Sequence, residues 1–376
     1  MTPLWVHPVP QPKIRFRFWT SVNLNILEIH QMLEKGLVQI YTSKSNHMNF
    51  APIGLSLRAA GQGLRSFVIC FSPHELMEGV RTASLHLKPN LIIDYSAVEQ
   101  SSSVEEGNDH ASYQILNAFQ RAKEAVFSGD FDIVILNSIL HVLEQDLLPL
   151  EEIITLIEKK PKNVELVLSG TGASEELIEK ADLVTEMVVH HLERPVQSGK
   201  RPDRNGVIEV ITGKGKGKTT YCLGKGLLTS CMGMPVLVFQ FIKSPRPYGE
   251  VKAIKKIPHL EIKTMGRGFL NKHSPYLNEK HKKAARQAWE LWLRQIYSQD
   301  YEFVVMDEIN IATHHGLINA ERVREMLLIR PHKFHILLSG RNAHPEVMQV
   351  ASSVIEMREI KHPFQKGIRA RKGIEY

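Results

Sequence analysis

The sequence predicts an α/β protein with two tandem domains, each a mostly parallel sheet covered by helices. Three observations lead to this prediction. The 376 residues are too many for one ordinary domain, segments 170 residues apart resemble one another, and apolar runs alternate with segments of helical periodicity. Hydrophobic residues make up 43% and charged residues 23%, which excludes disordered, collagen-like and coiled-coil chains.

Charge and cysteine content narrow the class of protein further. The net charge of +7 favours anionic ligands such as nucleotides or nucleic acid, without choosing between them. No apolar run is long enough to span a bilayer, and residues 1–20 lack the continuous apolar stretch of a signal peptide. Because Cys70, Cys222 and Cys231 have no paired spacing, we expect free thiols and a cytoplasmic location.

An internal repeat organises the chain. Gly36-Leu-Val-Gln-Ile-Tyr-Thr42 resembles Gly206-Val-Ile-Glu-Val-Ile-Thr212, and residues 160–187 resemble 330–357 at the same spacing. Ten pairs in the second comparison are identical without a gap, far above the roughly one in twenty of random pairs. We therefore predict an N-terminal arm and helix at 1–35, a first domain at 36–192, a polar linker at 193–205 and a second domain at 206–376.

Each domain is expected to alternate strands and helices, which indicates a parallel sheet between helical layers. In the second domain the strands are expected at 207–211, 235–242, 303–306 and 334–338, and a helix at 277–297. In the first domain the matching strands are expected at 39–41, 66–71, 133–136 and 165–168. The apolar segment 23–35 is expected to form a helix, which either packs across the interface between the domains or covers its own domain.

A glycine-rich loop, Thr212-Gly-Lys-Gly-Lys-Gly-Lys-Thr-Thr220, follows the first strand of the second domain. Glycines let successive backbone amides face one anion, and the helix behind the loop adds its positive end. Lys218 is expected to reach nucleotide phosphates, and the Thr219 hydroxyl to bind Mg²⁺. The loop is one residue shorter than the usual P-loop, and the alternative is a flexible lysine-rich turn. The predicted nucleotide-binding residues are Gly213, Lys214, Gly215, Lys216, Gly217, Lys218, Thr219 and Thr220.

Two further strand ends carry charged groups. Asp307 and Glu308 follow the strand at 303–306, and Arg341 follows the strand at 334–338. Because the carboxyl ends of parallel strands meet at one edge, these groups should lie beside the loop, as in P-loop NTPase-like (RecA-like) domains. We predict that the two carboxylates hold Mg²⁺, directly or through water, the alternative being a solvated turn. Arg341 either binds phosphate oxygens or is an ordinary surface residue.

The first domain lacks this chemistry at the corresponding positions. Met48 replaces the loop lysine and Asn49 the threonine that follows it. Asn137 and Ser138 replace the carboxylate pair, and Thr171 replaces the arginine. The apolar framework is retained, which indicates a degenerate copy that serves as a scaffold or as a partner surface.

The second domain resembles the P-loop corrinoid adenosyltransferases, the cob(I)yrinic acid a,c-diamide and cob(I)alamin adenosyltransferases. The resemblance covers essentially all of 206–376, and the first domain is similar to the same family at lower similarity. The motifs that carry it are the loop at 212–220, Gln240-Phe-Ile-Lys243, Gly266-Arg-Gly-Phe269, Met306-Asp-Glu308, Arg330-Pro331, Ser339-Gly-Arg341, Lys361-His-Pro-Phe364 and Gly367-Ile-Arg-Ala-Arg-Lys-Gly-Ile-Glu-Tyr376.

The resemblance implies transfer of the 5′-deoxyadenosyl group from ATP to the Co(I) of a corrinoid, with release of triphosphate, in adenosylcobalamin synthesis or salvage. Reduced cobalt is the nucleophile, so the protein has to hold and neutralise the triphosphate. Lys218, Lys216, the loop amides and Arg341 are expected to do so with Mg²⁺, while Phe269 forms an apolar wall under the corrin. Asn271 stands where the family commonly has an aromatic residue, which weakens that wall.

The resemblance also implies partners. Family members are typically homodimers, so the chain is expected to form either a homo-oligomer or a pseudo-dimer in which the first domain supplies the partner surface. A flavoprotein reductase is expected to supply Co(I). No membrane or nucleic-acid partner is expected.

Two other functions remain open. A non-catalytic ATP- or corrinoid-binding regulator or carrier is favoured by Asn271 and the degenerate first domain; turnover of ATP to triphosphate separates it from a transferase. A RecA-like ATPase acting on nucleic acid would bind with a steep salt dependence. The basic residues that suggest it are Lys252, Lys255, Lys256, Lys263, Arg267, Lys280, Lys282 and Lys283.

Overall fold

The structure is a computed structural model that describes residues 33–45, 48–72, 77–95, 107–191, 206–268, 275–298, 301–331 and 333–376. These residues belong to one compact unit, Met32–Tyr376. We call residues 33–191 the first half and 206–376 the second half. Most of the helix predicted at 23–35 lies outside the described residues, and so do residues 192–205, so the predicted domain and linker limits stay predictions.

Strands and helices alternate along both halves in the same order. The first half contains β1 (Val38–Ser43), α1 (Ala51–Gly61), β2 (Ser66–Cys70), α2 (Met77–Leu87), β3 (Leu91–Tyr95), α3 (Gly107–Phe127), β4 (Ile133–Asn137), α4 (Ile139–Glu144), α5 (Leu150–Lys159), β5 (Glu165–Thr171), α6 (Glu175–Lys180) and β6 (Leu183–His191). The second half contains β7 (Ile208–Thr212), α7 (Lys218–Cys231), β8 (Val236–Gln240), α8 (Gly249–Ile254), β9 (Leu260–Thr264), α9 (Pro275–Ser298), β10 (Phe303–Asp307), α10 (Ile309–His314), α11 (Ala320–Ile329), β11 (His335–Ser339), α12 (Pro345–Gln349), β12 (Ser353–Lys361) and the 3-10 helix η1 (Pro363–Lys366).

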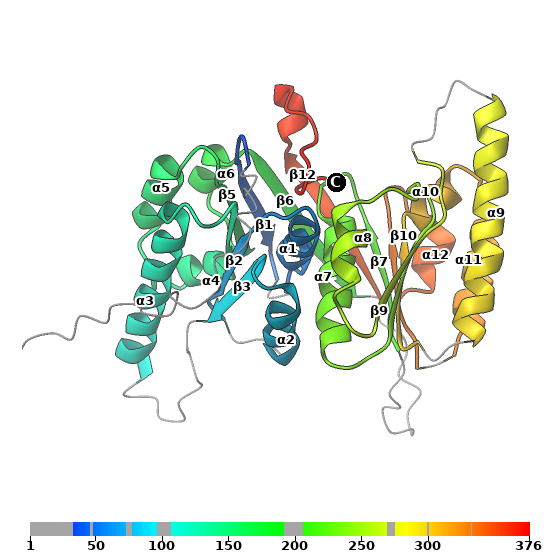
Figure 1. The fold of residues 1–376 in the computed structure, drawn as a ribbon, viewed down its shortest axis with the longest axis horizontal. Helices are drawn as coiled ribbons and strands as arrows, with labels where there is room; N and C mark the ends of the chain where they lie inside the picture. Colours follow the sequence, from blue (N-terminus) through cyan, green and yellow to red (C-terminus); the bar gives the residue numbers. More distant parts are fainter. Residues whose placement is uncertain are drawn as a thin grey trace, which may run out of the picture. The chain divides into compact units, whose positions relative to one another are not determined.

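The described strands form one sheet of 12 strands in the order β3-β2-β4-β5-β1-β6-β12-β7-β11-β10-β8-β9 (Figure 1). Neighbouring strands are parallel within each half. The halves join through the antiparallel pair β6–β12, in which Met187 lies opposite Met357. The predicted fold class, two tandem domains with mostly parallel sheets, is confirmed.

Helices cover both faces of this sheet. One face carries a single core shared by both halves, to which α1, α2, α7 and α8 contribute. On the other face each half has its own core, under α3–α6 in the first half and α9–α12 in the second. Among the described residues, no helix combines the length and apolar character needed to cross a bilayer. Among the described residues, the three cysteines are buried and form no disulfide, as predicted.

Helices α1 and α7 cross at equivalent glycines. A Cβ atom on Gly54 would lie 1.8 Å from the carbonyl oxygen of Thr220, and one on Gly224 would lie 2.1 Å from that of Phe50. These distances are far below van der Waals contact, so only glycine permits the two backbones to approach this closely. The crossing brings the start of α7, behind the glycine-rich loop, against the first half.

Candidate active site

The glycine-rich loop connects β7 to α7 and lies against β12. Gly213 and Gly217 have φ angles of 95° and 106°, a backbone conformation that favours glycine. A Cβ on Gly213 would lie 2.3 Å from the carbonyl oxygen of Met357, and the amide of Gly215 donates to that oxygen at 2.7 Å. The sequence curls here because its glycines tolerate both the dihedral angles and the contact with β12.

Asp307 is a fully buried carboxylate at the end of β10, and it gathers three donors. Its Oδ1 accepts from the Thr219 hydroxyl at 2.9 Å and from the Ser339 hydroxyl at 2.6 Å. Its Oδ2 accepts from Nε2 of Gln240 at 2.9 Å, and the Lys243 ammonium lies 3.6 Å away. The structure therefore joins the predicted metal residues Thr219 and Asp307 directly.

Glu308 follows Asp307 in a left-handed conformation, with φ 64°. Its amide donates to the Ser339 hydroxyl at 3.2 Å. Burial and the neighbouring Asp307 raise the pKa of Glu308 to about 7. Among the described residues, its buried Oε2 has no hydrogen-bond partner, and neither does Oε1 of Gln240. Mg²⁺ prefers oxygen ligands, and these unpartnered oxygens beside a buried carboxylate are of that kind. The residues therefore fit this cation.

Lys218 is the first residue of α7, and its ammonium donates to the carbonyl of Gly215 at 2.5 Å. Burial lowers the pKa of Lys218 to about 8. Arg341 is exposed and donates to the carbonyl of Lys214 at 3.3 Å, which places it at the rim of the loop. Both predicted cations therefore lie at the loop.

Two other predicted nucleotide-binding side chains point elsewhere. The Lys216 ammonium pairs with Oε1 of Glu375 at 2.8 Å. The Thr220 hydroxyl donates to the carbonyl of Gly217 at 3.1 Å and so supports the first turn of α7. Phe269, the predicted corrin wall, lies outside the described residues. The same is true of Asn271, which departs from the family pattern.

Three residues of the site were not predicted as site residues from the sequence, although they lie within the family motifs. Gln240 and Ser339 hydrogen-bond Asp307, and Lys243 lies near it. Each sits at or just beyond the carboxyl end of a strand, which is the signal that could have found them.

The first half keeps the supports of this site without its carboxylates. Ser138 has φ 66°, the Ser169 hydroxyl donates to Asn137 Oδ1 at 2.8 Å, and the Ser138 amide donates to Ser169 at 3.2 Å. These contacts match those around Asp307 and Glu308 in the second half. However, α1 begins only at Ala51, whereas α7 begins at the residue that corresponds to Met48.

A glycine loop between a strand and a helix, a lysine at the start of that helix, and a hydrogen bond from Thr219 of that helix to Asp307 at a strand end define a P-loop protein of the α/β class. The particular family follows from the sequence. The chain belongs to the ATP:corrinoid adenosyltransferase family BtuR/CobO/CobP, whose sequence profile matches residues 34–201 and again 204–376.

The relatives named corrinoid adenosyltransferase match about half of this chain, and another relative matches a longer part. A corrinoid adenosyltransferase of Sinorhizobium sp is 39% identical over 181 residues, which cover 47% of this chain and 83% of that protein. One from Pseudomonas aeruginosa is 35% identical over 175 residues, covering 46% and 85%. An uncharacterized protein of Nostoc sp. is 29% identical over 269 residues, covering 68% and 69%.

Proposed function

We propose that this chain transfers the 5′-deoxyadenosyl group of ATP to the Co(I) of a corrinoid and releases triphosphate, and that the second half alone carries the active site. The observation that carries the proposal is the hydrogen bond from Thr219 to the buried Asp307, beside Lys218, in a chain of this family. The first half, without a loop lysine or a carboxylate pair, is its non-catalytic copy, the product of an internal duplication.

The reaction suits the residues at the loop. Reduced cobalt attacks the 5′ carbon of the ribose, the C–O bond to triphosphate breaks, and the leaving group takes that electron pair. No protein base is needed, so the protein contributes position and charge stabilisation. Loop amides, the positive end of α7, Lys218 and Arg341 are the groups available to hold the triphosphate.

Mg²⁺ would be held by Thr219 and Asp307, with Glu308 as a further oxygen donor. When bound, it would neutralise charge that develops on the leaving triphosphate. The unpartnered Oε2 of Glu308 supports this assignment, because a buried carboxylate oxygen without a donor is costly unless a cation approaches.

The remaining parts of the proposal rest on the resemblance to the family. Phe269 would line the corrin, and Asn271 would make that wall less apolar than is usual in the family. The first half would take the place of the second subunit of a homodimer, and a flavoprotein reductase would supply Co(I) in the cytoplasm.

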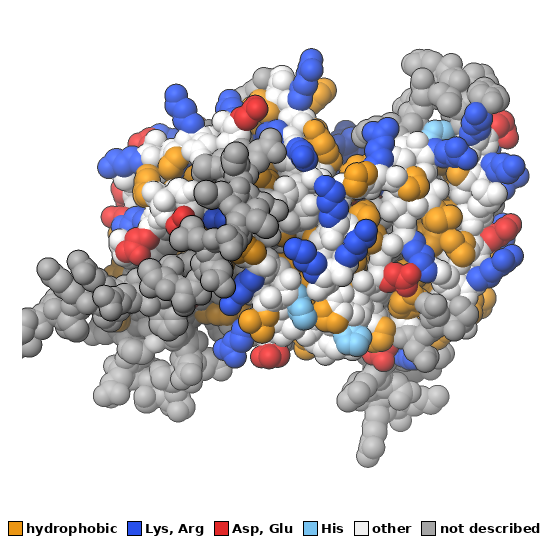
Figure 2. All heavy atoms as spheres, viewed as in Figure 1, with side chains coloured by type: hydrophobic (Ala, Val, Ile, Leu, Met, Phe, Trp, Pro, Cys, Tyr) orange, Lys and Arg blue, Asp and Glu red, His pale blue; other side chains and the backbone are white. Residues whose placement is uncertain are grey.

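The basic residues of α9 give little support to a nucleic-acid ATPase. Lys280, Lys282 and Lys283 share that helix with Glu279, which pairs with Lys282 at 3.0 Å. Figure 2 likewise shows Lys and Arg side chains interspersed with Asp and Glu along the α9 side of the visible face. This mixture is typical of a solvated helix face.

An anaerobic assay tests the proposed reaction. The full chain is mixed with MgATP and chemically reduced cobalamin, and adenosylcobalamin and triphosphate are measured. Equal amounts of the two products are expected. Binding of MgATP without either product would overturn the transferase proposal and favour the regulator or carrier.

A further inference from the structure

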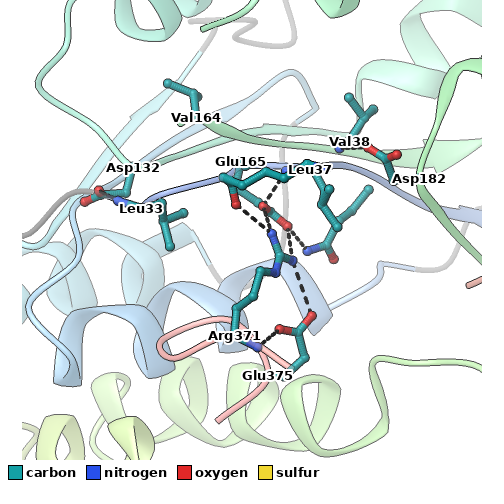
Figure 3. Close-up of polar contacts among 12 residues, drawn as sticks. Leu33, Leu37, Val38, Asp132, Val164, Glu165, Asp182, Arg371 and Glu375 are labelled. Carbon is teal, nitrogen blue, oxygen red and sulfur yellow. Dashed lines mark hydrogen bonds and ion pairs between the residues drawn. The ribbon is translucent and has the colours of Figure 1, made fainter. Parts of the chain in front are cut away.

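The C-terminal segment Arg371–Tyr376 connects the phosphate loop to the first half. Its Glu375 receives the Lys216 ammonium at 2.8 Å. Its Arg371 binds both carboxylate oxygens of Glu165, at 2.6 and 2.9 Å (Figure 3). Arg371 also donates to Glu375, through its amide at 2.7 Å and its guanidinium at 3.3 Å. A chain of four alternating charges therefore runs from the loop to a strand of the first half.

Glu165 is the fixed end of this chain. It is the first residue of β5, its side chain is fully buried, and it accepts from the amide of Leu37 at 2.7 Å (Figure 3). A buried carboxylate is tolerated when its charge is paired and its lone pairs are filled. The bidentate contact with Arg371 fills that role, so the position of Arg371 is tightly defined.

A second branch leads from Glu165 to the next residue of the loop. Gln39 hydrogen-bonds Glu165 through Nε2 and accepts from the Tyr41 hydroxyl at 2.9 Å. The Tyr41 ring lies 3.0 Å from where a Cβ of Gly217 would stand. One carboxylate of the first half therefore reaches two consecutive loop residues, Lys216 and Gly217, by separate routes.

Arg58 of α1 holds the same segment from a different side. Its guanidinium donates to the carbonyls of Ile374 and Glu375, both at 3.1 Å, and pairs with buried Glu250 at 3.0 Å. Ile374 is buried in the core that both halves share. The segment is thus anchored to the first half by charge and by packing.

The side chains that the first half contributes to this network are not repeated at the corresponding positions of the second half. The residues 170 positions after Glu165, Gln39, Tyr41 and Arg58 are different in type: His335, Glu209, Ile211 and Leu228. Glu209 pairs instead with Lys225 at 2.6 Å, within the second half. The first half therefore has side chains for this contact that its counterpart lacks.

We propose that Glu165 is a positioning residue for nucleotide binding by the loop of the second half. It anchors Lys216 through Arg371 and Glu375 and seats Tyr41 against Gly217. In this arrangement the Lys216 side chain is a tether of the loop, and the phosphates meet backbone amides and Lys218. The inference rests on the proposed nucleotide site and adds that the first half completes it.

The physical reason is preorganisation. Loop amides that converge on one point repel one another when no anion is bound, so an untethered loop relaxes away from the binding conformation. Nucleotide binding must then include the cost of ordering the loop. Loss of the tether should weaken MgATP binding about tenfold, which corresponds to the entropic cost of immobilising one or two side chains.

Calorimetric titration of the full chain with MgATP tests the inference without any corrinoid. Glu165→Gln keeps the size of the side chain and removes its charge, and we expect about tenfold weaker binding. The matched control is His335→Gln, at the corresponding position of the second half, which should bind within twofold of the wild type. Arg371→Lys keeps the charge but loses the bidentate contact with Glu165, so it should also weaken MgATP binding. This variant tests the inference if Glu165→Gln does not fold.

A double-variant cycle separates positioning from general destabilisation. Lys216→Met removes the tether at the loop, so adding Glu165→Gln to it should weaken binding by less than Glu165→Gln does alone. Amide hydrogen exchange should accelerate in the loop peptide 213–220 of Glu165→Gln and stay unchanged in α11.

The outcomes distinguish the two proposals. If the wild type does not bind MgATP, the proposed function is wrong. If the wild type binds but Glu165→Gln and Arg371→Lys bind equally well, the inference is wrong and the nucleotide site stands. The inference would also be wrong if the double variant lost MgATP affinity by the full product of the two single-variant factors, Glu165→Gln and Lys216→Met.

Discussion

Lys218 and Glu308 are ionisable side chains at the phosphate loop that titrate near neutral pH. Burial lowers the pKa of Lys218 to about 8, and burial with Asp307 raises that of Glu308 to about 7. A triphosphate would favour the charged form of Lys218, and a cation the charged form of Glu308. Ligand binding should therefore restore charges that burial opposes in the ligand-free protein.

Lys218→Ala should abolish MgATP binding or lower turnover by several orders of magnitude, because a desolvated triphosphate would lose its principal cation. Titration calorimetry and the adenosylation assay measure this. The matched control is Met48→Ala at the corresponding position of the first half, which should leave turnover nearly unchanged. Equal damage from both changes would contradict a single active site in the second half.

Glu308→Gln should stabilise the ligand-free protein in a pH-dependent way. The folded-state pKa of Glu308 is raised, so ionising it costs stability progressively as pH rises from about 4.5 to about 7. The neutral variant avoids this cost, and its free energy of unfolding should exceed that of the wild type by up to about 3 kcal/mol at pH 8. Urea unfolding should show the gain shrinking towards pH 5; a gain independent of pH would contradict the assignment.

Sequence motifs predicted part of this site and could not predict the rest. Lys218, Thr219 and Asp307 were predictable because a P-loop and a strand end fix where they lie. The pairing of Lys216 with Glu375 was not, because it depends on where the C-terminal segment packs, 159 residues away. The role of Phe269 stays a prediction.

At the scale of single elements, the buried strands were the easiest to predict. The strand predicted at 235–242 is β8, Val236–Gln240, and the helix predicted at 277–297 is α9, Pro275–Ser298. Strands β3, β6, β9 and β12 were not predicted. Strands β3 and β9 lie at the edges of the sheet, where half-buried residues break the continuous apolar run of a central parallel strand. In β6 and β12, charged and histidine residues interrupt the apolar run.

The crossing of α1 and α7 predicts that two Gly→Ala substitutions in α7 change the stability of the protein in different directions. Gly224→Ala should destabilise the protein by about 3 kcal/mol or more, because the new methyl group would meet the backbone of Phe50 at 2.1 Å. Gly226→Ala is the control, because its methyl group would meet only side chains at 3.4 Å or more. It should be neutral or stabilise by up to about 1 kcal/mol through helix propensity. Urea unfolding compares the two; equal effects would show that the crossing is looser than described.

For the whole molecule, the repeat predicted two similar halves but not how they join. Strands β6 and β12 would each be an unpaired sheet edge, which is a liability in an isolated domain. Their antiparallel pairing removes both edges, and Met187 opposite Met357 marks equivalent residues of the two halves. Such a pairing depends on which edge strands match in register and shape, and the repeat alone carries no information about that.

The nucleotide stoichiometry is the prediction that belongs to the whole chain. Burying a triphosphate without cations is prohibitive, and the first half has Met48, Asn137 and Ser138 where the second has a lysine and two carboxylates. Calorimetric titration of the full chain should therefore saturate at about one MgATP per chain.

Fragments of the chain locate that single site. A fragment of residues 1–195 should bind no nucleotide even when folded. We expect a fragment of residues 206–376 to dimerise or aggregate, because it exposes β12 and the face of α7 that packs on α1. Where it stays soluble, it should bind MgATP more weakly than the full chain, since Glu165 and Tyr41 are missing. Two equivalent sites per intact chain would refute both the inactivity of the first half and its role as the built-in partner of the second.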